Sequence, residues 1–299
     1  MNGRSRLKRP VVGDDEGPPE PKPLVPGVAS ALSPLVRRVL APNPGLMTGP
    51  GTNTYLVGID EVAVIDPGPD DAGHRDAIIG AGGDRIRWIV CTHTHIDHAP
   101  GAPKLAKQTG AEILAYDSRD GLKVQRELRD GDRIEGTEFR LTAVHTPGHA
   151  SNHLCFLLEE ERTLFSGDHV MQGSTVVISP PDGDMAAYLA SLERLRSKRP
   201  ALRAIAPGHG HVIEDPAAVL DEYLEHRRER EGQVVDALAA LDGTATPAEI
   251  VERVYVDLVD GLKPWAQRTV HAHLRKLHDE GRVETKDPDD ATATWALLE

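Results

Sequence analysis

The chain has 299 residues, of which 39% are apolar and 27% are charged, so it can form one large catalytic domain and a small second one. Its formal net charge of −13 disfavours non-specific binding to polyphosphates, which depends on lysine and arginine side chains displacing counterions. No apolar run reaches the roughly 20 residues of a membrane span, and no apolar segment follows the basic residues 1–10 to make a secretory signal. The two cysteines, Cys91 and Cys155, lie in apolar runs and are predicted to be reduced core residues, as is typical of a cytoplasmic protein.

The chain begins with a segment rich in proline and charge, and residues 1–30 are predicted to be a disordered arm. Residues 31–215 then alternate short apolar runs, broken by proline and glycine, with helical patterns, which predicts an α/β (mixed α+β) catalytic domain. Predicted strands cover residues 36–40, 54–57, 62–65, 86–91, 112–115, 138–144, 153–158, 163–165 and 204–206, and predicted helices cover residues 71–81, 102–109 and 185–197.

The remaining residues follow a different pattern. Residues 216–242 are predicted to form a long linking helix. Helices over 247–256 and 264–280 and a hairpin over 282–298 then predict a winged-helix-like domain at residues 243–299. On its second helix the apolar residues Trp265, Val270, Leu274 and Leu277 are expected in the core, and His271, His273 and His278 are expected to face solvent.

A dense group of potential metal ligands follows the predicted strand at residues 86–91. His93 and His95 are two positions apart, so in an extended segment both imidazoles lie on one face and can approach one cation. Asp97 and His98 follow at a turn and can reach a second cation about 4 Å away. A single histidine in a loop says little, but four ligand-type residues within six positions predict a metal site.

Three further candidate ligands lie downstream, each directly after a predicted strand or its turn. They are His149, Asp168 and His209, and small residues before each one allow the backbone to turn sharply. Five histidines and two aspartates suit two divalent ions, with zinc as the predicted metal and manganese or iron as alternatives. His145 and His153 flank one of these loops, and His153 is a candidate for orienting a ligand.

These motifs, HxHxDH, TPGH, SGD and PGHG in that order, resemble the metallo-β-lactamase superfamily. The resemblance implies an αββα sandwich with two central sheets and a C-terminal winged-helix-like domain. It implies that Asp66 orients ligands without being one. It further implies that His93, His95 and His149 bind one metal, that Asp97, His98 and His209 bind the other, and that Asp168 bridges them.

A narrower resemblance extends from about residue 36 to residue 298. Residues 41–56, the Tyr223-x-x-His226-Arg227-x-x-Arg230 pattern and the C-terminal module are similar to the β-lactamase-like protein 2 group. That group includes an animal mitochondrial endoribonuclease acting on single-stranded RNA and fungal enzymes that hydrolyse acyl carrier protein thioesters. The resemblance therefore implies a hydrolase but leaves its substrate open.

The predicted reaction is hydrolysis by a metal-bridging hydroxide, with Asp97 as the catalytic residue that orients the nucleophile. The first hypothesis for the substrate is single-stranded RNA, with Arg227 and Arg230 as basic contacts, although a solvated helix face also explains them. The second is a small thioester or ester, which the acidic charge fits better. The third, a nucleic-acid-binding regulator, is disfavoured because acidic residues outnumber lysine and arginine in the winged-helix-like domain. That domain is instead expected to cover the active-site groove or to form a homodimer contact.

Overall fold

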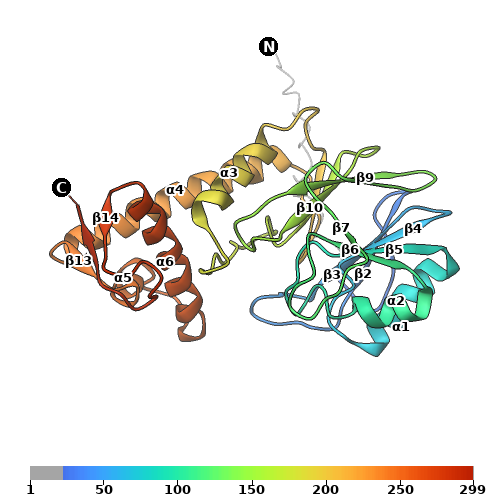
Figure 1. The fold of residues 1–299 in the computed structure, drawn as a ribbon, viewed down its shortest axis with the longest axis horizontal. Helices are drawn as coiled ribbons and strands as arrows, with labels where there is room; N and C mark the ends of the chain where they lie inside the picture. The colour runs from blue at the N-terminus through green and yellow to red at the C-terminus, as the bar shows by residue number, and fades with distance from the viewer. Residues whose placement is uncertain (1–22, 299) are drawn as a thin grey trace, which may run out of the picture.

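Two β-sheets pack face to face, and helices cover both outer surfaces (Figure 1). The computed structural model describes residues 23–298. The first sheet contains, in spatial order, β1 (Ser30–Ala31), β2 (Val36–Leu40), β3 (Asn53–Val57), β4 (Val62–Ile65), β5 (Ile86–Val90), β6 (Glu112–Ala115) and β7 (Arg126–Glu127). The second contains β12 (Ala204–Pro207), β11 (Thr163–Gly167), β10 (Leu154–Leu158), β9 (Arg140–His145) and β8 (Arg133–Glu135).

Both sheets are mixed, and the parallel pairs are the ones that position the site. In the first sheet each strand from β1 to β4 pairs antiparallel with the next one, whereas each strand from β4 to β7 pairs parallel with the next one. In the second sheet only β11 and β12 are parallel. Parallel neighbours need a crossover connection. Helices supply three of them, namely α1 (Ala72–Gly82) with η1 (Gly83–Arg85), α2 (Ala102–Thr109) and α3 (Met185–Arg196), whereas β6 and β7 are joined by a loop.

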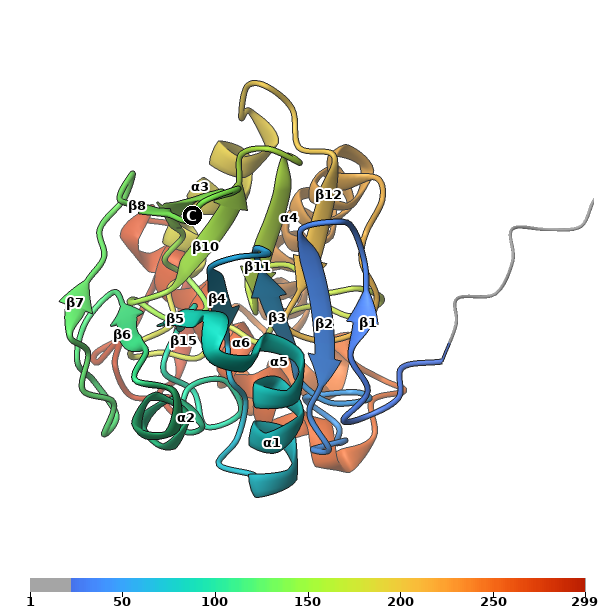
Figure 2. The same cartoon turned by 90° about the vertical axis from the view of Figure 1, so that its right-hand side faces the viewer.

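The core consists of three apolar layers. The central one lies between the sheets and includes Tyr55, Ile65, Phe156 and Phe165. A second fills the space between the first sheet and helices α1 and α2, and a third lies between the second sheet and helices α3 and α4 (Pro216–Ala240). Figure 2 gives the view in which the strands of both sheets can be followed. Strand β4 lies between two of these apolar layers and is therefore buried on both faces. This explains its unbroken apolar sequence, Val-Ala-Val-Ile.

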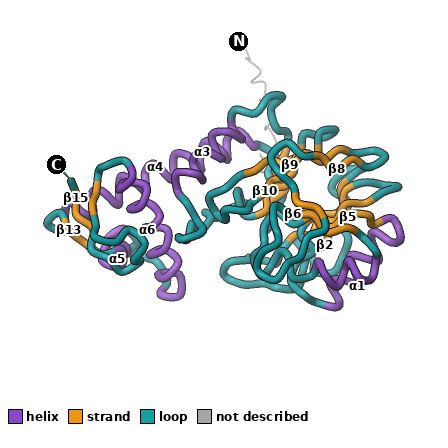
Figure 3. The backbone as a smooth tube through the Cα atoms, viewed as in Figure 1, coloured by secondary structure: helices purple, strands orange, loops and turns teal. Residues whose placement is uncertain are grey.

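The C-terminal module forms a fourth cluster around the fully buried Trp295. Its elements are β13 (Thr244–Ala245), α5 (Pro247–Val254), η2 (Asp260–Leu262), α6 (Lys263–Asp279), β14 (Val283–Glu284) and β15 (Trp295–Leu297). Helix α5 begins with a capping box, because the Thr246 hydroxyl accepts from the backbone N–H of Glu249 and the Glu249 carboxylate accepts from that of Thr246. Figure 3 shows helix α4 leading from the strand-rich part of the chain to this helix-rich module.

Some expectations about exposure are wrong. Val270, Leu274 and Leu277 are buried as predicted, but Trp265 is 39% exposed. His271 and His273 are buried because their side of α6 faces the hairpin and α4: His271 Nε2 is 2.9 Å from the carbonyl of Pro288 and His273 Nδ1 is 3.6 Å from Glu231.

The last residues of the predicted disordered arm are ordered. Residues 1–22 lie outside the described part, but Gly27 donates its N–H to the carbonyl of Leu40, and β1 pairs with β2. Edge pairing with the first sheet therefore orders residues that composition alone assigned to the arm. Among residues 23–298, no helix is both long and apolar enough to span a membrane.

Candidate active site

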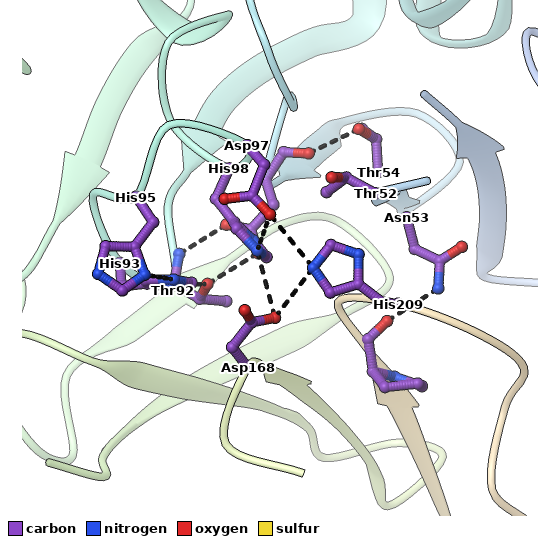
Figure 4. Close-up of polar contacts among 12 residues, drawn as sticks. Thr52, Asn53, Thr54, Thr92, His93, His95, Asp97, His98, Asp168 and His209 are labelled. Carbon is purple, nitrogen blue, oxygen red and sulfur yellow. Dashed lines mark hydrogen bonds and ion pairs between the residues drawn. The ribbon is translucent and has the colours of Figure 1, made fainter. Parts of the chain in front are cut away.

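The seven predicted ligands lie at one edge of the sandwich, where several strands end. Residues 93–98 follow β5, residue 168 follows β11, residue 209 follows β12, and residue 149 lies in the loop from β9 to β10. The carboxyl ends of parallel neighbours meet at the same edge of a sheet, which is why segments far apart in sequence converge here. Figure 4 shows the residues of this edge that come from β5, β11 and β12 pointing toward one another.

The first group consists of His93, His95 and His149, whose ligand nitrogens lie within 4.8 Å of one another. His95 Nδ1 is 3.0 Å from Nε2 of His93 and 3.0 Å from Nε2 of His149. Burial lowers the pKa of His93 well below its usual value and that of His95 to about 4, so both rings are neutral at pH 7. Neutral imidazoles with facing lone pairs fit a cation.

The second group consists of Asp97, His98, Asp168 and His209, whose ligand atoms also lie within 4.8 Å of one another. Asp168 Oδ1 is 3.2 Å from His98 Nε2 and 3.3 Å from His209 Nε2. The other Asp168 oxygen faces the first group, 3.8 Å from His149 Nε2. Asp168 thus lies between the two groups and can contact ions in both.

Two buried atoms of the second group are the best test of whether the residues fit a metal ion. His98 Nε2 and Asp168 Oδ1 are buried and, although they lie 3.2 Å apart, neither makes a well-oriented hydrogen bond in the described part of the chain. Leaving such atoms unpaired costs free energy, which a bound cation would recover. Nitrogen and carboxylate ligands in this arrangement are those that zinc and similar ions prefer. The cluster can therefore bind metal ions.

The second group differs from the first in its charge. Burial lowers the pKa of His98, but the carboxylates of Asp168, Asp97 and Asp66 outweigh burial and hold that pKa well above 6.5. Burial likewise lowers the pKa of His209, whereas Asp168 and Asp97 raise it to about 9. In the metal-free protein these two histidines are therefore protonated at neutral pH.

Asp66, predicted to orient ligands, lies directly behind the second group. Its Oδ2 accepts a hydrogen bond from His98 Nδ1 at 2.9 Å and one from the Thr92 hydroxyl at 2.7 Å. Its Oδ1 accepts from the backbone N–H of Thr92, also at 2.7 Å. Asp66 therefore fixes the ring of His98 with Nε2 directed into the site, and it contacts no other predicted ligand this closely.

His153 supports the site from a different side. Its Nε2 accepts a hydrogen bond from the backbone N–H of Asp168 at 3.3 Å, and its Nδ1 donates to the Thr146 hydroxyl at 3.0 Å. Burial lowers the pKa of His153 well below its usual value, so the ring is neutral and can accept. The structure thus places both Asp66 and His153 where they position ligands.

Backbone carbonyls hold two further ligands in the same tautomer. His149 Nδ1 donates to the carbonyl of Val177 at 2.8 Å, and His209 Nδ1 donates to that of Gly51 at 3.1 Å. In each ring this leaves Nε2 free to bind an ion. The loops that carry Gly51 and Val177 therefore help to orient ligands that lie far from them in sequence.

Asn53, which no sequence motif singled out, anchors the last ligand motif. Its side-chain N–H groups donate to the carbonyls of Pro207 and Gly210 at 3.0 and 2.9 Å, on either side of His209. Its backbone N–H donates to the carbonyl of Gly208 at 2.7 Å. Residues 51–53 belong to the segment that resembles the β-lactamase-like protein 2 group, but nothing in a single sequence links them to residues 207–210.

A cavity of about 470 Å³ opens over the metal-binding groups. Beyond the ligands its walls are mostly apolar, and they come from four separate segments: the loop before β3, the loop after β5, the loop after β11 and helix α6 of the C-terminal module. The wall residues outside the ligand set are Met47, Thr48, Ile96, Met171, Val176, Val177, Ser179, Asp182, Trp265 and Arg268. The C-terminal module, which was expected to cover the groove, thus contributes Trp265 and Arg268 to its wall.

The predicted RNA contacts Arg227 and Arg230 do not line this cavity. Arg227 is only 2% exposed, so the alternative of a solvated helix face is wrong for this residue. Its guanidinium lies over the Tyr188 ring, 5.2 Å from the centroid, and donates to the carbonyl of Val176. Arg230 is half-buried, with its guanidinium 4.0 Å from the centroid of Tyr255. Both arginines line a second cavity.

Comparison with known proteins gives two family matches. The profile described as the metallo-beta-lactamase superfamily matches residues 47–209, and that of the beta-lactamase associated winged helix domain matches residues 246–295. An atrochrysone carboxyl ACP thioesterase of Cryptosporiopsis sp. is 33% identical over 276 residues, 84% of this chain and 82% of the relative. A beta-lactamase-like protein 2 homolog of Caenorhabditis elegans is 32% identical over 280 residues, 88% of this chain and 90% of the relative.

Solved structures agree on the fold. A beta-lactamase domain protein from Burkholderia ambifaria superposes with a TM-score of 0.78 at 22% identity, covering 92% of this chain and 95% of that one. At this identity the likeness concerns the fold alone. The predicted αββα sandwich, the winged-helix module and the enzyme class are thereby confirmed. On the family matches and the relatives together, the chain is a hydrolase that belongs to the metallo-beta-lactamase superfamily.

Proposed function

We propose that this hydrolase holds two divalent metal ions, zinc being the first candidate, and cleaves a thioester or ester of an apolar acyl group. The observation that carries the choice of substrate is the lining of the cavity over the ligands. Among the described residues that line it, Arg268 is the one lysine or arginine, whereas Ile96, Met171, Val176 and Trp265 offer apolar surface.

Charge supports the same substrate class. The cavity also contains Asp97, Asp168 and Asp182, and the chain carries a net charge of −13. A polyanion entering this cavity would meet one guanidinium and three carboxylates, although bound metal ions would offset part of that charge. An uncharged acyl group meets no such opposition. The thioesterase named among the relatives is consistent with this reading.

Divalent ions held by the seven ligands would supply Lewis acidity and a water activated at neutral pH. The chain's own contribution starts with Asp97, whose side chain is 21% exposed and whose Oδ2 lies 3.3 Å from His209 Nε2. This carboxylate is placed to accept a proton from the attacking water. The water oxygen bonds to the acyl carbon, the bond from that carbon to sulfur or oxygen breaks, and the leaving group keeps the electron pair and receives the proton.

Arg268 and Trp265 would position the substrate. Arg268 Nη1 donates to the Ser179 hydroxyl at 3.0 Å, which leaves its other N–H groups available to the substrate. Trp265 presents a partly exposed indole at the same wall, with the Arg268 guanidinium 5.4 Å from its ring centroid. Together they offer an apolar surface with one hydrogen-bond donor group beside it.

The same pair supports a second candidate, a phosphodiester of single-stranded RNA. An exposed indole can stack on a base and a neighbouring guanidinium can bind a phosphate. We rank this candidate below the thioester because the cavity over the ligands offers a single such pair, which serves one nucleotide, and because its three carboxylates oppose a polyanion.

The deciding experiment is a side-by-side assay of the metal-loaded protein on acyl thioesters, aryl esters and labelled single-stranded RNA. Asp168→Ala is the inactive variant, and Asp70→Ala, a surface carboxylate paired with Arg75, is the matched control. We expect thioester or ester turnover that disappears in Asp168→Ala and persists in Asp70→Ala. RNA cleavage with the same dependence, and no thioester turnover, would promote the second candidate. RNA cleavage that survives Asp168→Ala indicates a contaminating nuclease.

A further inference from the structure

A second cavity of about 240 Å³ lies next to the one over the metal ligands. The two share five lining residues, so they form neighbouring compartments of one groove between the sandwich and the C-terminal module. The shared residues are Met47, Met171, Val176, Val177 and Trp265. A substrate bound at the metal-binding groups can therefore extend past Trp265 into the second cavity.

The far wall of the second cavity carries positive charge. Helix α4 contributes His226, Arg227 and Arg230 to it, and no aspartate or glutamate is among its described lining residues. Within residues 23–298, no carboxylate oxygen lies within 4.0 Å of a nitrogen of these three side chains. The remaining walls are mainly apolar, with Leu258 and Leu262 from the C-terminal module.

These basic groups are incompletely satisfied. Arg227 Nε, Arg230 Nε and His226 Nδ1 are buried and have no hydrogen-bond partner in the described part of the chain. Arg227 is only 2% exposed, and within residues 23–298 its guanidinium makes one hydrogen bond, to the carbonyl of Val176. A buried guanidinium without an anionic partner is costly, and a carboxylate or phosphate matches its forked donors.

We infer that the second cavity is a subsite for an anionic group, a carboxylate or phosphate, carried at the end of an apolar segment of the substrate. The apolar segment lies along Met47, Val176 and Trp265, and the anion is bound by Arg230 with the help of Arg227. The inference rests on the proposed function only in taking the scissile bond to lie at the metal-binding groups. The anionic end is a feature of the substrate that the proposed function does not specify.

The test compares ligands that differ only in the group at their far end. The metal-loaded protein is titrated calorimetrically with alkyl monocarboxylates, dicarboxylates of the same chain lengths and the corresponding ω-phosphonocarboxylates. One carboxylate is common to all three and can occupy the metal-binding groups, so a difference reports on the far end. We expect at least one anionic-ended series to bind about tenfold more tightly than the monocarboxylate, or ~1.4 kcal/mol. The tighter of the two series identifies carboxylate or phosphate as the preferred group.

Arg230→Gln removes the charge at the half-buried end of the cavity without opening the core, and Arg230→Lys keeps it. Arg228→Gln is the matched control, because Arg228 is the neighbouring arginine of the same helix, 64% exposed and 3.3 Å from Glu193. We expect the preference for the anionic end to be lost in Arg230→Gln and retained in Arg230→Lys and Arg228→Gln.

Equal affinity for neutral and anionic ends at every chain length would overturn the inference, as would a preference that survives Arg230→Gln or is lost equally in Arg228→Gln. Binding is measured without turnover, so failure of the subsite inference is distinguishable from failure of the proposed function. An intact preference without thioester or ester hydrolysis would retain the subsite and reject the proposed reaction. Thioester or ester hydrolysis without a preference for the anionic end would retain the proposed reaction and reject the subsite.

Discussion

Asp66 accepts a hydrogen bond from His98 Nδ1 at 2.9 Å, and both side chains are almost completely buried. The same carboxylate accepts two bonds from Thr92, so it joins the end of β4 to the segment that carries four ligands. Its backbone has a φ of 49°, in the left-handed region, which turns the chain at the end of the strand. The orientation of His98 therefore depends on a residue outside the ligand set.

Asp66→Asn is expected to weaken metal binding in the second group about 10- to 100-fold, as is common when a partner of a ligating histidine is changed. An amide cannot supply the charge that the carboxylate gives to His98. Metal affinity by competition with a chelator is the measurement. Asp70→Asn, which changes an exposed carboxylate bonded to Arg75 and Lys104, should leave affinity unchanged. Equal affinities for Asp66→Asn and the unmodified protein would show that Thr92 and the backbone suffice to hold His98.

Metal loading should occur in two stages that differ in pH dependence. His93 and His95 are neutral at pH 7, whereas the pKa of His209 is about 9 and that of His98 is well above 6.5, so His98 and His209 must release protons to bind a metal while His93 and His95 need not. We expect affinity at the second group to rise with pH up to about 9. Calorimetry in buffers of different ionisation enthalpy measures the protons released, and a count that is zero at pH 7.5 for both stages contradicts the assignment.

His209 makes the stability of the metal-free protein depend on pH in the opposite direction, so that stability falls as pH rises. The pKa of His209 rises from 6.5 to about 9 on folding, so its contribution to stability is fully present below pH 6.5 and is lost as pH rises through about 9. Denaturant unfolding of the metal-free protein should therefore show lower stability at pH 9.5 than at pH 6.5. His209→Gln removes this contribution, and the difference between the two pH values should shrink in that variant.

Gly208→Ala is expected to abolish metal binding at the second group with little change in the fold. A Cβ at this position would lie 2.7 Å from Asp168 Oδ1 and 2.8 Å from His98 Cε1, so at least one ligand must move. Gly80→Ala is the matched control, because its Cβ would meet nothing within 4 Å in helix α1. That change should stabilise the protein by about 0.5–1 kcal/mol. Metal content and thermal unfolding measure the two effects.

Trp265→Ala and Arg268→Gln should impair catalysis without reducing metal content. If the substrate is an apolar thioester, Trp265→Ala should lower kcat/KM about tenfold, mainly through KM, since the lost contact binds substrate and transition state alike. If the substrate is RNA, Arg268→Gln should have the larger effect, and that effect should weaken at high salt. Unchanged kinetics in both variants would exclude this wall from substrate binding.

The sequence indicated which residues gather at this edge of the sandwich because each motif is local. His93 to His98 are six consecutive positions after an apolar strand, and Asp168 and His209 each follow a strand of their own. Strand ends and small residues are visible without knowing how distant segments pack. The same locality explains why Asp66 and His153 could be selected but not assigned specific partners.

The cavity walls were less accessible to prediction because they depend on tertiary packing. Trp265 has the apolar character of a core residue, yet it lies where α6 meets the loops of the sandwich. Arg227 has the character of a surface residue, yet Tyr188 and Val176 from other segments enclose it. Asn53 bonds to residues more than 150 positions away, and no local pattern encodes such a pairing.

Helix α6 has its own core around Val270, Leu274 and Trp295, but it places Trp265 and Arg268 over ligands that the sandwich holds. Mutations at those two positions can change which molecule fits while Asp66, His153 and the backbone carbonyls keep the ligands in place. The residues that would contact substrate and the residues that hold the ligands thus lie partly in different parts of the chain. A protein engineer who seeks new substrates would randomise Trp265 and Arg268 first, because changes at this wall leave the metal-binding groups intact.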